Sequence, residues 1–184
     1  MSHSTTAIGP VPAWPALPEA AWVATRQTLH MWTQIVGKTR LALCPRLNHW
    51  WQVPLYVTPR GLSTGPMPYA AGSCEVVFDF VGQCLRLHTS NGQAHTMPLE
   101  PRSVADFYHH YRALLREAGI EVKMWPVPVE VPDTTTFPDN HHLHLTLAFR
   151  VRLRDKKKPA GWAGLTLGND TLKLCLLSPA SFRP

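Results

Sequence analysis

The sequence predicts an α+β domain in which a mostly antiparallel sheet carries two helices on one face. Two stretches, near residue 30 and near residue 110, show the periodicity of amphipathic helices. Residues 74–99 between them alternate as a three-strand meander, with shorter strands before and after it. Because helices and strands are segregated along the chain in this order, we expect the helices to pack together on the sheet.

The first helix is predicted from apolar residues that recur at spacings of three and four. These are Trp22, Thr25, Leu29, Trp32 and Val36. Pro18 suits the first turn, and Gly37 suits the C-terminal cap. His30, Gln34 and Lys38 recur every four residues and form a polar stripe beside the apolar one. This stripe could line the rim of a pocket or be an ordinary solvent-exposed flank.

Two strand-like runs follow the predicted cap. Residues 40–44 alternate and break at Pro45, and residues 50–57 alternate with large side chains on both faces. A strand of the second kind is usually covered on both sides, or buried on one side and facing a cleft on the other. Pro54 within it indicates an edge strand or a bulge, because proline cannot donate a ladder hydrogen bond.

Asn48, His49, Trp50 and Trp51 stand at the junction between the loop and this strand. Clefts commonly form at such junctions, so an amide, an imidazole and two indoles could line a binding site here. The alternative is that both tryptophans belong to the core and that Asn48 satisfies a turn.

The meander and the second helix have clear local signals. Gly82 and the Asn91-Gly92 pair mark the two hairpin turns of residues 74–99. Ser103, followed by an acid three residues later, opens the second helix in the manner of a capping box, and Gly119 ends it.

The segment after the second helix is predicted to begin as a strand and then to lose regular structure. Residues 120–124 alternate as a short strand, whereas residues 125–138 are punctuated by proline and lack helical or hairpin signals. We expect this second part to wrap the surface of the domain.

The charge is distributed unevenly along the 184 residues. Residues 1–140 hold ten Lys and Arg against ten Asp and Glu, whereas residues 141–184 hold eight against two and supply the whole net charge of +6. We therefore divide the chain into a flexible, proline-rich lead-in (1–13), an α+β domain (14–140) and a basic tail (141–184) that is either a β-hairpin or disordered.

The composition favours a soluble cytoplasmic protein. The first residues lack the basic and apolar regions of a signal peptide, and no stretch is long and apolar enough to span a membrane. The four cysteines contain no Cys-x-x-Cys pair and are interpreted as buried thiols, and the histidines near residue 142 have no acidic or cysteine neighbour. No metal site is predicted, and the sequence assigns no cofactor.

Three strings carry a resemblance to a known family: TLHMWTQIVGKTRLALCPRLNHWWQVPLYVTPRGL, PLEPRSVADFY and WPVPVEVPD. In order and spacing they resemble the bacterial family of unknown function DUF5996, from about Trp14 to about Asn140. The resemblance implies no activity or cofactor, because none is assigned to that family. Its members look longer, with further aromatic, His and Glu residues in a second half.

The chain departs from this resemblance after Asn140, where the charge also changes. A frameshift or a truncated reading frame is the favoured explanation, since natural domains seldom change composition so abruptly. Against it, the apolar residues of 143–153 alternate regularly, which would suit a genuine hairpin.

Our leading functional hypothesis is a small-molecule-binding or enzymatic pocket between the first helix and residues 48–58. His49 and His30 are the candidate acid/base residues, and Arg40 or Arg60 would clamp an anion. The ligand-binding candidates are Gln34, Lys38, Arg40, Asn48, Trp50, Trp51, Tyr56 and Arg60.

Two alternatives belong to other classes. A structural or interaction module would use its aromatic surface to meet a missing C-terminal half or another chain, and would form a concentration-dependent homo-oligomer. Nucleic-acid binding would use the basic residues of the tail, but the neutral charge of residues 1–140 counts against it.

Overall fold

The computed structural model describes residues 18–142, so the predicted lead-in (1–13) and residues 143–184 of the predicted tail lie outside the described part. Two α-helices and six strands form the domain. They are α1 (Val23–Leu43), β1 (Tyr56–Thr58), β2 (Gly61–Ser63), β3 (Met67–Tyr69), β4 (Gly72–Asp79), β5 (Cys84–Thr89), β6 (Ala94–Pro98) and α2 (Val104–Glu117), with 3-10 turns η1 (Glu19–Ala21), η2 (Asn48–Trp50) and η3 (Phe137–Asp139).

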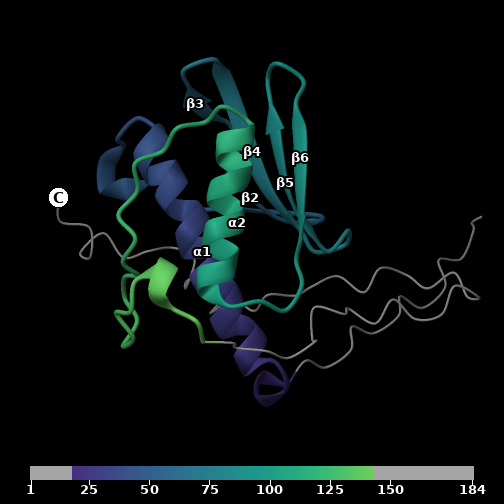
Figure 1. The fold of residues 1–184 in the computed structure, drawn as a ribbon, viewed down its shortest axis with the longest axis vertical. Coiled ribbons are helices and arrows are strands. Elements are labelled where there is room, and N and C mark those ends of the chain that lie inside the picture. The colour runs from purple at the N-terminus through teal and green to yellow at the C-terminus, as the bar shows by residue number, and fades with distance from the viewer. Residues whose placement is uncertain (1–17, 143–184) are drawn as a thin grey trace, which may run out of the picture.

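The strands form one antiparallel sheet in the order β1-β2-β4-β5-β6, with β3 also paired to β4. Figure 1 shows α1 and α2 side by side in front of this sheet. The predicted α+β class is therefore confirmed, and so is the meander of β4, β5 and β6.

The strand register gives the sheet one apolar face. Phe78 of β4 pairs with Leu85 of β5, and Leu85 pairs in turn with Met97 of β6. All three are buried, whereas their neighbours Val77 and Arg86 on the other face are only half-buried. Because side chains alternate between faces, this register places the apolar residues beneath the helices.

An aromatic column joins the sheet to both helices. The Trp32 ring of α1 stacks on Phe107 of α2 at a centroid distance of 4.5 Å, and Phe107 lies parallel to Phe78 of β4 at 6.3 Å. Such ring pairs contribute about 0.5–1.5 kcal/mol each beyond the burial of their area. A buried hydrogen bond of 2.8 Å between Thr39 Oγ1 and Tyr111 Oη adds a polar link between the helices.

The predicted end of the first helix at Gly37 is wrong. The helix continues to Leu43, so residues 40–44 are not a strand. Gly37 is buried in mid-helix, where an added Cβ would lie 4.0 Å from Val53 Cγ1. The helix ends where Pro45 restricts the residue before it to an extended conformation.

Two predicted strands are also absent from the described residues. Within residues 50–57 only the last two belong to a strand, because the chain first forms η2 and a turn. His49 and Trp50 adopt left-handed backbone angles there, with φ of 54° and 61°. Residues 120–124 run without strand pairing.

Residues 125–137, which we call the strap, run along the outside of α1 (Figure 1). Up to η3 the strap lacks regular structure, in agreement with the predicted wrapping segment. Gln34 of α1 fixes it, since Nε2 donates to the Val129 carbonyl at 2.8 Å and Oε1 accepts from the Val129 N–H at 2.8 Å. Phe137 closes the strap with an N–H bond of 2.8 Å to the carbonyl of Pro126.

The strap completes the enclosure of α1. Every residue from 31 to 40 is buried, including the polar ones. The predicted solvent-exposed flank is therefore covered, and a polar residue on that flank must find its partner within the protein.

Replacement of Gln34 by alanine is expected to lower the free energy of unfolding by about 2 kcal/mol, because both backbone groups of Val129 lose their partner. Hydrogen exchange at the Val129 amide should become faster. Urea denaturation and exchange measurements test this, with Gln27→Ala on the exposed side of the same helix as the matched control. Unchanged protection at Val129 would contradict the role assigned to Gln34.

Candidate functional site

The residues predicted to form one site lie in three separate places. His30, Gln34 and Lys38 lie on the side of α1 that the strap covers. A second group gathers around the loop between α1 and β1, where Arg40 and Tyr56 meet. Arg60 stands in the turn that follows β1 and binds elsewhere.

The orientation of Gln34 determines the tautomer of His30. The amide nitrogen of Gln34 directs one hydrogen to the Val129 carbonyl and the other to His30 Nε2, which lies 3.2 Å away. His30 Nε2 must then be an acceptor, so the ring is neutral with its proton on Nδ1. Burial lowers the pKa of His30 below its ordinary 6.5, Glu130 opposes this shift, and Arg26 adds to it.

Lys38 follows Gln34 by one turn and is a buried cation. Its side chain is 5% exposed, and Nζ lies 5.8 Å from the centroid of the Phe137 ring. No carboxylate of residues 18–142 forms an ion pair with it. Burial lowers the pKa of Lys38 to about 8.

Arg40 is a second buried cation, and it points to the other side of α1. Its guanidinium lies 5.0 Å from the centroid of the Tyr56 ring, and Nε donates to the Gln52 carbonyl at 2.5 Å. The residue is 5% exposed, and its Nη1 is buried without a hydrogen-bond partner in the described residues. No carboxylate of that part of the chain pairs with it either.

Gln52 holds this region together, although the sequence analysis did not single it out. Its backbone carbonyl accepts from Arg40, and its side-chain oxygen accepts from the Leu47 N–H at 3.1 Å. The sequence signal that could have identified it is a glutamine within a run of large apolar residues. Such a glutamine becomes buried with its neighbours and must then find hydrogen-bond partners inside the protein.

The loop after α1 forms a small, half-open pocket of about 310 Å³. Its lining residues are Arg46, Leu47, Asn48, His49 and Trp50. The guanidinium of Arg46 lies 4.5 Å from the Trp50 ring centroid, so one wall combines a charge with an indole face. The left-handed conformation of His49 and Trp50 costs about 1–3 kcal/mol for each residue, and strain of this kind gathers at binding sites.

Trp51 does not belong to the core. It is 67% exposed, and its ring lies 6.3 Å from that of His49. The alternative that both tryptophans are core residues is therefore wrong for Trp51, while Trp50 is half-buried.

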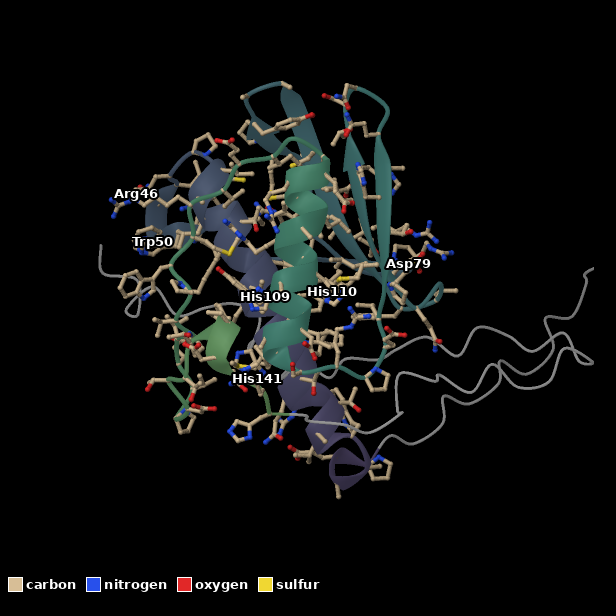
Figure 2. All side chains as sticks on the ribbon, viewed as in Figure 1. Arg46, Trp50, Asp79, His109, His110 and His141 are labelled. Atoms are coloured by element: carbon tan, nitrogen blue, oxygen red, sulfur yellow. The ribbon has the colours of Figure 1, made fainter. Side chains whose placement is uncertain are left out.

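Arg60 forms a salt bridge with an acidic residue. Its Nη2 lies 2.7 Å from Asp79 Oδ2, and Asp79 also accepts from Arg86 and from the Gly82 N–H. Burial alone would raise the pKa of Asp79, but these hydrogen bonds outweigh it and lower the pKa. Figure 2 shows Asp79 on the opposite side of the domain from Arg46 and Trp50, so Arg60 lies away from the loop pocket.

Other classes of site find little support in residues 18–142. Cys74 is buried and the free thiols of Cys44 and Cys84 are half-buried, while the fourth cysteine lies outside this part. In the same residues no three His, Cys, Asp or Glu side chains gather as metal ligands. No helix between residues 18 and 142 has the length and hydropathy needed to cross a membrane.

Stability is expected to depend on pH through His30. Since its pKa is lower in the folded than in the unfolded protein, the unfolded state binds more protons as the pH falls below 6.5. The free energy of unfolding should have its highest value above pH 6.5. It should decrease as the pH falls from 6.5 towards the lower pKa of His30 in the folded protein. Protonation of His30 also puts a hydrogen on Nε2, which then faces an N–H of the Gln34 amide, so the hydrogen bond between them is lost.

Urea unfolding between pH 7.5 and pH 5 tests this expectation. The variant His30→Phe should lose part of the pH dependence, whereas His88→Phe, at an exposed position on the outer face of the sheet, should retain it. Equal pH dependence in both variants would remove His30 as the cause.

Comparison with known proteins gives one result. No curated protein and no solved structure matches the chain. The model of DUF5996, a family of unknown function, matches residues 14–147 and so covers the whole described domain. The chain therefore belongs to the DUF5996 family.

Proposed function

We propose that this domain binds a small anionic ligand, a carboxylate or a phosphate, through Arg40. The observation that carries the proposal is the buried guanidinium whose Nη1 lacks a partner in residues 18–142 and which no carboxylate of those residues neutralises. A buried, unpaired charge is costly, and arginine cannot avoid the cost by losing its proton. An anion at this position would supply both the charge and the missing hydrogen bond.

The contacts of Arg40 favour a bidentate ligand. Nε is engaged with Gln52, and the Tyr56 ring covers one face of the guanidinium. These two contacts fix the plane of the group and leave its Nη end as the edge for a ligand. Carboxylates and phosphates commonly accept two parallel hydrogen bonds from such a fork.

Space beside the fork depends on Gly65. An added Cβ there would lie 3.5 Å from the Tyr56 ring and 3.8 Å from Arg40 Nη1. Its φ of 62° also favours glycine over residues with a side chain. Tyr56 is 53% exposed, so movement of this one ring would open the guanidinium to a ligand from solvent.

Binding rather than catalysis is proposed. His30 lies under the strap, where its ring is held against Gln34, and it does not belong to the Arg40 site. His49 lines the neighbouring loop pocket together with Asn48 and Trp50, and these residues would contact the remainder of a larger ligand.

The test is a thermal-shift and calorimetric titration of the full chain with phosphate, acetate and citrate, compared with chloride at constant ionic strength. At least one of the three anions should raise Tm and bind measurably. In Arg40→Met the affinity should fall at least tenfold, which corresponds to the loss of about 1.4 kcal/mol or more from a charged hydrogen bond.

Arg116→Met is the matched control, because Arg116 is exposed on α2 and belongs neither to the Arg40 site nor to the loop pocket. Should Arg40→Met fail to fold, Gly65→Ala leaves the guanidinium in place and adds a Cβ 3.8 Å from its Nη1, in the space beside the fork. This variant should also bind more weakly. No response of the wild-type protein to any of the three anions, or equal binding by all variants, would overturn the proposal.

A second candidate function is self-association through the surface around β1. Four large apolar side chains of β1 and the loop before it are more than half exposed: Leu47 (54%), Trp51 (67%), Tyr56 (53%) and Val57 (57%). Among the described strands β1 is an edge of the sheet, and no other described strand pairs with its outer side. Two copies could pair their β1 edges antiparallel and cover these side chains.

Sedimentation of the same samples distinguishes the two candidates. If the surface serves self-association, the wild-type protein should form dimers as its concentration rises, and Trp51→Glu should shift this equilibrium towards monomer. A protein that stays monomeric at high concentration would exclude the second candidate and leave the anion site unaffected.

A further inference from the structure

We propose that Lys38 is a reactive amine beneath the strap, able to condense with a small uncharged aldehyde to form an imine. The inference does not depend on the Arg40 site. Lys38 and Arg40 are two residues apart, which places them on nearly opposite sides of the helix. Their contacts agree with this placement, since Lys38 lies over the Phe137 ring and Arg40 over the Tyr56 ring.

The surroundings of Lys38 set the chemistry. The side chain is 5% exposed, and no acid of residues 18–142 pairs with the amine. The tip of the side chain lies over the Phe137 ring, with 5.8 Å between Nζ and the ring centroid. This distance is near the outer limit for an effective cation–π contact, so the ring offers little stabilisation to the charged form.

Access to the amine depends on the strap, which Gln34 ties at Val129 one turn before Lys38. Local opening of the strap would uncover the amine without unfolding the sheet.

Neutral amine is the nucleophile in imine formation. With burial lowering the pKa of Lys38 to about 8, a substantial share of its amine is neutral near pH 7.4, whereas an ordinary lysine is almost fully charged. The nitrogen lone pair attacks the carbonyl carbon, the resulting carbinolamine loses water, and a C=N bond replaces the C=O bond. No oxidant or reductant takes part.

The proposed substrate class follows from the same contacts. Among the described residues Lys38 has an aromatic neighbour and no second cation in contact, so nothing there would bind a carboxylate or a phosphate on the substrate. The site therefore suits an uncharged aldehyde, and the burial of Lys38 favours a small one.

The experiment treats the full chain with propanal and cyanoborohydride, which reduces the imine to a stable secondary amine, and measures each lysine by peptide mass spectrometry across pH 6–10. Lys123, exposed and in the same protein, is the internal control. Labelling of Lys38 should rise with a midpoint near pH 8, well below that of an ordinary lysine. The conformation in which the strap covers Lys38 is the dominant one. The pKa of Lys38 in that conformation therefore sets the midpoint, even if only the conformation with an open strap reacts.

Two variants complete the test. Lys38→Arg should lose the adduct with the low midpoint and leave labelling of Lys123 unchanged. Gln34→Ala, which releases the strap, should increase the labelling rate of Lys38 at least tenfold at pH 7.4. A midpoint of Lys38 at the value of an ordinary lysine, or no labelling of Lys38 while Lys123 reacts, would overturn the proposal.

Discussion

The enclosure of α1 is the constraint on which the rest of this structure depends. A surface helix normally buries one stripe, but residues 31–40 of α1 are buried all round, between the sheet, α2 and the strap. The apolar side is secured by the aromatic column through Trp32 and Phe107. The polar side chains cannot reach water freely, so each must be accommodated inside the protein.

Three polar side chains meet this demand in three ways, and the difference follows from their chemistry. Gln34 is neutral, and one backbone peptide satisfies both ends of its amide. Lys38 carries a charge but can lose its proton, so burial moves its pKa instead of requiring an ion partner. Arg40 retains its charge at any ordinary pH, and its buried Nη1 has no partner among the described residues. The same burial thus points to structure at Gln34, to reactivity at Lys38 and to an anion at Arg40.

The sequence predicted what local patterns determine and missed what distant contacts determine. The meander and α2 were predicted because alternation, hairpin turns and the Ser103 cap are local signals, and Ser103 does accept from the Asp106 N–H. The cap at Gly37 was wrong because a glycine that allows close packing looks the same in sequence as one that ends a helix. The role of Gln34 depends on a residue 95 positions away, and that of Arg60 on an acid 19 positions away. Arg40 was named as a candidate, but the absence of an acid beside it could not be known before the fold.

Gln52 connects the two halves of the candidate binding region. Its backbone carbonyl positions Arg40, while its side chain holds the Leu47 N–H at the start of the strained turn through His49 and Trp50. Left-handed residues of this kind persist only where the surrounding contacts hold them. Gln52 is therefore the residue that joins Arg40 to the loop, so the position of the guanidinium and the shape of the pocket from Arg46 to Trp50 depend on the same side chain and carbonyl.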